Sequence, residues 1–251
     1  MIYLKMEVSL VAEQITRIGN FPITNSLILA WITMAVLILF GAASTFKLAP
    51  VPGKLQNVAE VLIEKLYGFI RGVMGTDRDT EKVFPIIVTF FIFILLSNWF
   101  GLVPGVGTIG THAEHHGQYV FLPFLRAPAS DLNTTLAFAL ISVIITNIFA
   151  IAAIGFSKHF GKFISFKSPL EFFIGILESI AEVAKIISFS FRLFGNIFAG
   201  EVLLIVIGVL VPYIAPIPFL GLEIFVGFIQ ALVFSMLTLI FIKVAIAETE
   251  H

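Results

Sequence analysis

Long runs of apolar residues, separated by short polar segments, make up most of this chain. Three runs, at residues 26–46, 83–103 and 132–156, each have close to the roughly 20 residues that cross a bilayer core as a helix. Two longer apolar blocks follow, at residues 169–211 and 219–247. The pattern therefore predicts five membrane-crossing helices.

The fourth block has clear ends and is too long to stand upright in a bilayer. Ser168-Pro169-Leu170-Glu171 is a capping box with proline at the first helical position, and the next proline is Pro212. One helix over this block would be roughly 65 Å long, whereas a bilayer core is about 30 Å thick. Such a helix must tilt steeply, break, or lie along a partner. The fifth block, about 43 Å long by the same rise, would complete a long, steeply tilted hairpin over residues 169–247.

One polar segment has a helical pattern of its own. Between residues 54 and 75, apolar residues recur at helical spacing opposite a charged face: Val58, Val61, Leu62, Leu66, Phe69 and Val73. We expect an amphipathic helix on the inner membrane surface. The alternative is a short soluble helix hairpin.

Composition agrees with a membrane protein. The chain of 251 residues is 59% hydrophobic and only 12% charged, with a mean hydropathy of +1.05. In soluble domains, about a quarter of all residues are charged. There is no cysteine, which excludes disulfides and thiolate chemistry, and the net charge of -1 does not suggest a nucleic-acid partner. No removable signal peptide is expected. The fold class is an all-α polytopic membrane protein, with one membrane domain over residues 1–251.

Lysine and arginine set the expected orientation. Nine lie in the segments 47–82 and 157–168, whereas the N-terminal tail and the segment 104–130 hold only Lys5, Arg17 and Arg126. The N-terminal segment, residues 1–25, should therefore face outside and the C-terminus inside.

The fourth block carries ionisable residues at membrane depth, which are costly there and usually functional: Glu178, Glu182, Lys185, Arg192 and Glu201. Glu201 lies nine residues after Arg192, so it is about 180° round the helix and roughly 13 Å further along. The two cannot form an intrahelical ion pair, which needs a spacing of three or four. Asn196, in contrast, shares the face of Arg192.

The acids also lie at different depths. Glu178 and Glu182 belong to the inner part of the helix, Glu201 to the outer part, and Glu223 to the outer end of the last helix, with Gln230 on its stripe. An arginine between them stays charged at physiological pH. It can block a direct proton leak, and it can draw a proton off a partner's carboxylic acid, since two opposite charges about 4 Å apart attract by about 4 kcal/mol at an effective dielectric near 20.

Four segments resemble subunit a of F-type ATP synthases: RLFGNIFAGE at 192–201, FIQALVFSML at 228–237, PASDLN at 128–133, and SNWFGLVPG with Asn98. The resemblance implies that Arg192 faces the carboxylates of a rotating c-subunit ring. It implies an outer proton half-channel lined by Glu201 and Glu223, and an inner one lined by Glu178 with Ser188 or Glu182. Polar supports would be Asn196, Gln230, Asn98, Asp131 and Asn133.

The resemblance also implies a biological setting. The subunit would couple proton flow to ring rotation and ATP synthesis without catalysing a reaction or binding a cofactor. Its partners would be the c-ring, the b subunits of the peripheral stalk, other ATP synthase subunits and the bilayer, in the bacterial inner (plasma) membrane or the mitochondrial inner membrane. The sequence departs from the family pattern at Glu223, where many members have histidine.

Other interpretations stay open at this stage. Lys185 could pair with Glu178 or Glu182, Asp131 could only cap a helix, and Asn196 and Gln230 could only join helices. Gly195, Ala199 and Gly200 are expected to be packing positions. The cluster from His112 to His116 is not expected to bind a metal. Two rival functions are a proton-coupled secondary transporter and a self-contained cation channel.

Overall fold

The computed structural model describes residues 12–46, 49–115, 118–163 and 168–247, without the side chains of residues 112–120 and of Lys162. Its helices are α1 Asn25–Thr45, α2 Lys54–Met74, α3 Asp77–Gly101, α4 Leu132–Ile154, α5 Phe156–Phe163, α6 Pro169–Leu210 and α7 Pro216–Ala247. Two antiparallel hairpins, β1 Gln14–Ile18 with β2 Phe21–Thr24 and β3 Gly110–His115 with β4 Gln118–Pro123, and the short 3-10 helix η1 Pro128–Ser130 complete the described part. Five helices, α1, α3, α4, α6 and α7, are long and apolar enough to cross a membrane, which confirms the predicted number.

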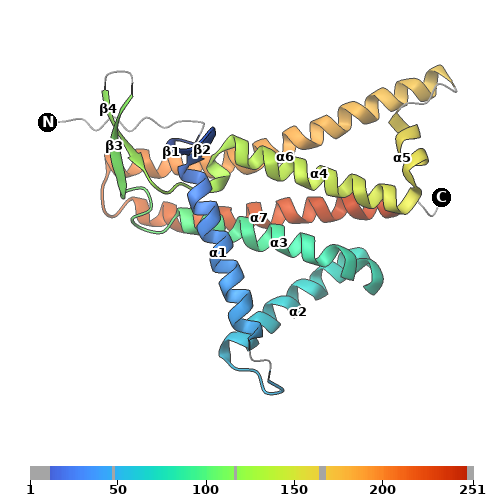
Figure 1. Ribbon diagram of the computed structural model, residues 1–251, viewed down its shortest axis with the longest axis horizontal. Coiled ribbons are helices and arrows are strands. Elements are labelled where there is room, and N and C mark those ends of the chain that lie inside the picture. The colour runs from blue at the N-terminus through green and yellow to red at the C-terminus, as the bar shows by residue number, and fades with distance from the viewer. Residues whose placement is uncertain (1–11, 47–48, 116–117, 164–167, 248–251) are drawn as a thin grey trace.

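The five long helices do not run parallel to one another. In Figure 1, α3, α4, α6 and α7 extend along the long axis of the molecule, whereas α1 crosses them steeply. With 21 residues, α1 is about 32 Å long, which matches an upright helix in a bilayer core about 30 Å thick. If α1 stands upright, the α6–α7 hairpin is strongly inclined, as its length requires.

The ends of α6 follow the sequence closely. Ser168 Oγ accepts a hydrogen bond from the backbone N–H of Glu171 at 3.2 Å, so the predicted cap is present. The helix continues for 42 residues to Leu210. α7 begins at Pro216, three residues before the predicted start, because proline fits the first turn of a helix.

The loops separate toward two ends of the molecule. Figure 1 shows the junction of α2 and α3, helix α5 and the C-terminal end of α7 toward one end. The two β-hairpins and the corner between α6 and α7 lie toward the other end. The segments that lysine and arginine assign to opposite membrane sides are thus apart, while the orientation itself stays a prediction.

Three features differ from the sequence expectation. α3 begins at Asp77 rather than residue 83, because Thr76 Oγ1 accepts from the N–H of Asp79 at 3.3 Å and caps the helix. α4 ends at Ile154, where Gly155 adopts a φ of 85° that favours glycine and turns the chain into α5. The β-hairpins in the two outer segments were not predicted.

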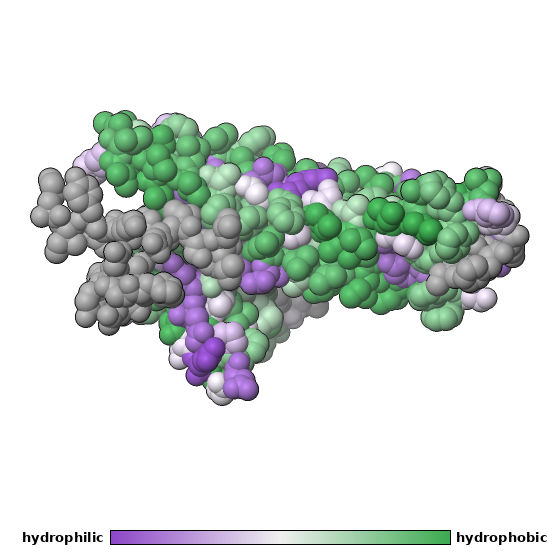
Figure 2. Space-filling model, turned by 90° about the horizontal axis from the view of Figure 1, so that it is seen from above, coloured by the Kyte–Doolittle hydropathy of each residue, from purple (hydrophilic) through white to green (hydrophobic). Residues whose placement is uncertain are grey.

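A phenylalanine-rich core joins the inclined helices. The rings of Phe90, Phe138 and Phe189, from α3, α4 and α6, all pack against Phe234 of α7 at centroid distances of 5.3 to 6.5 Å. On the face that Figure 2 shows, the surface along the bundle is largely apolar, with hydrophilic residues in a few patches. The apolar stripe of α2 is mostly exposed as well, which fits a helix that lies on a membrane surface.

Candidate functional site

Arg192 lies on the exposed face of α6, among exposed apolar neighbours such as Ile187 and Phe191. Its Nη2 donates to Ser188 Oγ at 3.2 Å, one turn earlier. Asn196 Nδ2 donates to the carbonyl oxygen of Arg192 at 3.0 Å, one turn later. In the part of the chain that the structure describes, no carboxylate lies within ion-pair distance of this guanidinium. A permanent cation is therefore presented outward without a counter-ion of its own.

The hairpin places a second polar residue beside this arginine. Gln230 of α7 and Arg192 of α6 line the same small cavity, which Phe189, Leu193, Phe234 and Leu237 close with apolar side chains. The pairing arises because α6 and α7 are antiparallel neighbours. Gln230 therefore lies beside Arg192, where the two helices meet.

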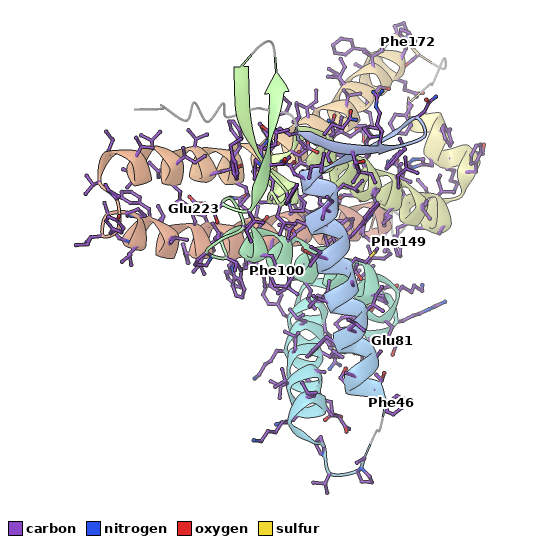
Figure 3. The ribbon with its side chains drawn as sticks, turned by 60° about the vertical axis from the view of Figure 1, so that its left-hand side comes forward. Phe46, Glu81, Phe100, Phe149, Phe172 and Glu223 are labelled. Carbon is purple, nitrogen blue, oxygen red and sulfur yellow. The ribbon has the colours of Figure 1, made fainter. Side chains whose placement is uncertain are left out.

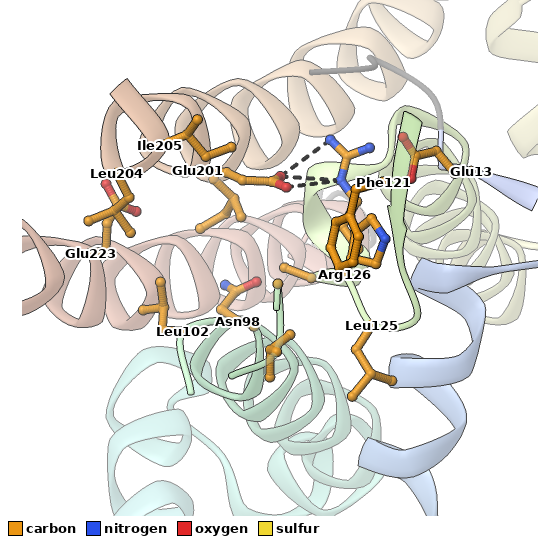
Figure 4. Close-up of a pocket in the computed structure, with 16 residues that line it drawn as sticks. Glu13, Asn98, Leu102, Phe121, Leu125, Arg126, Glu201, Leu204, Ile205 and Glu223 are labelled. Atoms are coloured by element: carbon orange, nitrogen blue, oxygen red, sulfur yellow. Dashed lines mark hydrogen bonds and ion pairs between the residues drawn. The ribbon is translucent and has the colours of Figure 1, made fainter. Parts of the chain in front are cut away.

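A larger cavity of about 250 Å³ lies between α3, α6, α7 and the loops toward the β-hairpin end, and Figure 4 shows its lining. We call it the acidic pocket. Its polar lining residues are Glu13, Asn98, Arg126, Glu201 and Glu223. The predicted residues Glu201, Glu223 and Asn98 thus meet in one cavity, whereas Arg192 lies on the other side of α6.

Arg126 and Glu201 form an ion pair in the acidic pocket. Arg126 Nε lies 3.2 Å from both carboxylate oxygens of Glu201, and Nη2 donates to Oε2 at 3.3 Å. Only 6% of the arginine side chain and 31% of the glutamate side chain are exposed. Arg126 Nε also contacts Ser130 Oγ at 3.1 Å, and the guanidinium lies 5.9 Å from the ring centre of Phe198.

Glu223 is the more buried acid of the pocket, with 5% of its surface exposed. Figure 3 places it between α6 and α7. Among the described residues, no donor lies within hydrogen-bond distance of its carboxyl group. Its space comes from Gly200, because a Cβ at that position would overlap the Glu223 carboxyl. The expectation that Gly200 is a close-packing position is therefore confirmed, and the group that it packs against is the carboxyl of Glu223.

Asn98 contributes an unpaired acceptor to the acidic pocket. Its Nδ2 donates to the carbonyl oxygen of Gly227 at 3.3 Å, and Trp99 Nε1 donates to that of Ile224 at 3.0 Å. These bonds fix α3 against α7. Asn98 Oδ1 is buried and has no hydrogen-bond partner among the described residues. Such an atom is costly to bury unless water or a ligand satisfies it, which marks the pocket as a place for polar occupants.

Asp131 and Asn133 do not line the acidic pocket. Asp131 is the N-cap of α4, with Oδ1 accepting from the N–H of Asn133 at 3.3 Å. Its other bonds reach the N–H of Ala12 and the hydroxyls of Ser26 and Thr134, at 3.0 to 3.4 Å. The side chain of Asn133 is exposed. The capping interpretation of Asp131 is therefore confirmed, and its carboxylate joins α1, α4 and the N-terminal segment.

The acids near the other end of α6 are arranged differently. Lys185 Nζ lies 2.5 Å from Glu182 Oε1, so the lysine pairs with Glu182 rather than with Glu178. Asn147 Nδ2 lies 3.5 Å from Glu182 Oε2, and its Oδ1 lies 2.8 Å from the Nε2 of His159 in α5. Glu178 is half-buried and has no ion-pair partner in the described part of the chain.

Sequence reasoning missed Arg126, Glu13 and His159 as polar residues of these regions. From the sequence, Arg126 counted only as one of the charges in the loops, because no local sequence pattern indicates that it is buried. The one available signal was its position two residues before the PASDLN segment. For a metal, no group of three suitable side chains occurs in the described residues, and the side chains from His112 to His116 lie outside them.

The fold and the site define a polytopic helical membrane protein with an acidic pocket on one face of an inclined helix and, on the other face, an arginine without a counter-ion among the described residues. The sequence matches the family described as ATP synthase A chain over residues 27–243, and the chain belongs to this family. It is 31% identical to ATP synthase subunit a of Moorella thermoacetica over 91% of this chain and 94% of that protein. It is 36% identical to ATP synthase subunit a of Desulforamulus reducens, over 90% and 81% of the two chains, and 33% identical to that of Syntrophobacter fumaroxidans, over 93% and 89%.

Proposed function

We propose that this chain is subunit a of the membrane sector of an F-type ATP synthase, a non-catalytic subunit that conducts protons. Two offset half-channels would lead protons to and from a ring of c subunits. Arg192 would face the ring carboxylates between the two half-channels. Proton flow would then drive ring rotation, and partner subunits would carry out ATP synthesis.

The observation that carries this proposal is the exposed, unpaired guanidinium of Arg192. An arginine within an apolar helix surface is costly in a bilayer and is expected to face a partner group or water. Glu182 and Lys185, the charged residues nearest to it in α6 on the inner side, are only half-buried and pair with each other. Of the two cations described in α6, Arg192 is therefore the one left for a carboxylate on another subunit. A ring carboxyl that comes within about 4 Å would lose its proton to water, because the attraction of about 4 kcal/mol at an effective dielectric near 20 favours the charged form.

The acidic pocket supports the outer half-channel. It holds Glu201 and Glu223, and it lies about 13 Å further along α6 than Arg192 by the helical rise of nine residues. On the other side of Arg192, Ser188 and Glu178 would line the inner half-channel. Glu178 lies about 21 Å before Arg192 by the same rise, so the two acidic regions are separated along the helix as well as around it.

The setting follows from the same proposal. The exposed stripe of α6 around Arg192 would contact the c-ring, and the b subunits of the peripheral stalk would contact other surfaces. The chain is a multi-pass membrane protein of a family with bacterial members. We place it in the bacterial inner (plasma) membrane, with the mitochondrial inner membrane as the alternative.

Proton-driven ATP synthesis in vesicles that contain the whole complex tests the proposal. Arg192→Ala should abolish synthesis while the complex still assembles, because the ring carboxyl then keeps its proton. Arg71→Ala is the matched control, since Arg71 is an exposed arginine in α2 that pairs with Asp77. Normal synthesis by an assembled Arg192→Ala complex would refute the role of this residue.

Co-purification separates this function from its rivals. The proposal expects the chain to purify with an oligomeric ring of small helical hairpins. A secondary transporter would act without a ring and would have paired halves with broken helices, and a self-contained channel would form a symmetric oligomer of this chain. The outward position of Arg192 does not favour a pore within one chain.

A further inference from the structure

The two acids of the acidic pocket have different surroundings. Both oxygens of Glu201 face the guanidinium of Arg126 at 3.2 to 3.3 Å. Glu223 has no described donor within hydrogen-bond distance, and its carboxyl group lies against the backbone of Gly200. Figure 4 shows Glu201 turned toward Arg126 and Glu223 on the side away from that arginine. Glu201 is therefore paired with the guanidinium of Arg126, whereas the carboxyl group of Glu223 is available to take up a proton.

Arg126 itself needs an anion. It comes from the loop between β4 and η1, yet its side chain is nine-tenths buried. A buried guanidinium is tolerated only when it is paired and hydrogen-bonded. Ser130 and the ring of Phe198 also contact this side chain and carry no charge. Protonation of Glu201 would remove the negative charge that faces Arg126 at 3.2 to 3.3 Å, so this ion pair resists protonation of the glutamate.

We infer that Arg126 is a positioning residue of the outer half-channel: it holds Glu201 as its counter-ion and thereby leaves Glu223 as the acid that carries the proton. The inference rests on the proposed function. A proton from the outer solution would bond to a carboxylate oxygen of Glu223. That O–H bond would break as the proton passes to a carboxylate of the ring, so that Glu223 returns to its charged form. Arg126 and Glu201 end each cycle unchanged.

The charged groups around Glu223 are few in the described residues. Glu201 comes from α6, Arg126 from the loop before η1, and Glu13 from the N-terminal segment, and all three line the same pocket. The facing group of α3 is the uncharged Asn98. Loss of the Arg126 charge would leave the acids of one cavity without this cation, and like charges in one site make their titrations interact.

The test measures proton uptake from the outer side as a function of outer pH, in vesicles that contain the whole complex. Arg126→Gln should lower uptake and shift its pH midpoint by about one unit or more, because Glu201 then competes for the proton. Arg126→Lys, which keeps a cation, should restore the normal midpoint. The double variant Arg126→Gln with Glu201→Gln should recover uptake to at least about fivefold above Arg126→Gln alone, a modest part of the roughly hundredfold that positioned proton transfer typically contributes.

Two results would overturn the inference. One is an unchanged pH midpoint in an assembled Arg126→Gln complex. The other is a double variant that assembles but recovers nothing, which would make Glu201 itself the carrier. Arg71→Gln in α2 serves as the control that should leave the profile unchanged. Either failure would leave the proposed function intact as long as Arg192→Ala still abolishes synthesis.

Discussion

Substitution of Asp131 tests whether this acid stabilises the fold or conducts protons. It is 4% exposed and accepts four hydrogen bonds at 3.0 to 3.4 Å, from Ala12, Ser26, Asn133 and Thr134. Three separate parts of the chain meet at this one carboxylate. Asp131→Ala removes all four bonds at once and leaves the donors around a buried space.

The magnitude follows from the type of each bond. Loss of an N-cap typically costs about 1 kcal/mol, and we assign about 1 kcal/mol to each of the other three bonds because they are long or have alternative partners. Ser26, for example, also contacts Thr24 at 3.1 Å. The sum is a loss of about 3–4 kcal/mol in the free energy of unfolding. A melting temperature lower by about 6–15 °C should result for a chain of this size.

The assay pairs thermal unfolding of the purified complex with proton uptake per assembled complex at a temperature well below unfolding. Asp131→Ala should unfold earlier, while uptake stays within about threefold of normal, far less than the roughly hundredfold expected for a proton-transfer group. Asn133→Ala is the matched control, because it keeps the backbone N–H that Asp131 accepts and removes only an exposed side chain. A large loss of uptake at unchanged stability would show that Asp131 conducts protons and would refute this reasoning.

Three further predictions concern the path itself. Glu223→Gln should slow proton uptake from the outer side by about tenfold or more, and uptake with an unchanged outer pH profile would contradict its role as carrier. Gly200→Ala should slow the same step, because the new Cβ overlaps the Glu223 carboxyl. Gly72→Ala in α2, with open space at its Cβ position, is the control that should leave the rate unchanged. Equal rates for the two variants would argue against the close approach. Glu178→Gln should change the dependence on inner pH in ATP-driven pumping but not that on outer pH, and the reverse result would exchange the two half-channels.

The long helices and the main feature of the site were predictable because they depend on local patterns. Apolar runs and the Ser168 cap set the bounds of α6 within one residue at each end. The nine-residue spacing of Arg192 and Glu201 placed them on opposite faces, as the exposed arginine and the pocket-lining glutamate are. Helical periodicity alone carries this information, so no tertiary contact was needed.

The acidic pocket could not be completed from the sequence, because its contacts join distant segments. Arg126 pairs with a residue 75 positions away, and Asn98 bonds to one 129 positions away. A loop arginine is usually solvated, so its burial depends on how the loop folds over α6. α5 was missed for a related reason, since a helix of 8 residues has too few turns for a reliable periodic pattern.

The two faces of α6 explain why this chain would need a moving partner. On its buried face, between Arg192 and Glu201, lie Leu193 and Ile197, both part of the apolar core with Phe189 and Phe234. These side chains separate the acidic pocket from the exposed arginine. Leu193 and Ile197 carry no group that could pass a proton. Under the proposed function, a proton in the pocket would therefore leave on a carboxyl group of another subunit. Under the proposed function, these side chains would also oppose a direct leak toward Glu178. Transfer would then require the partner to carry its charge past Arg192, which is the condition for coupling proton flow to motion.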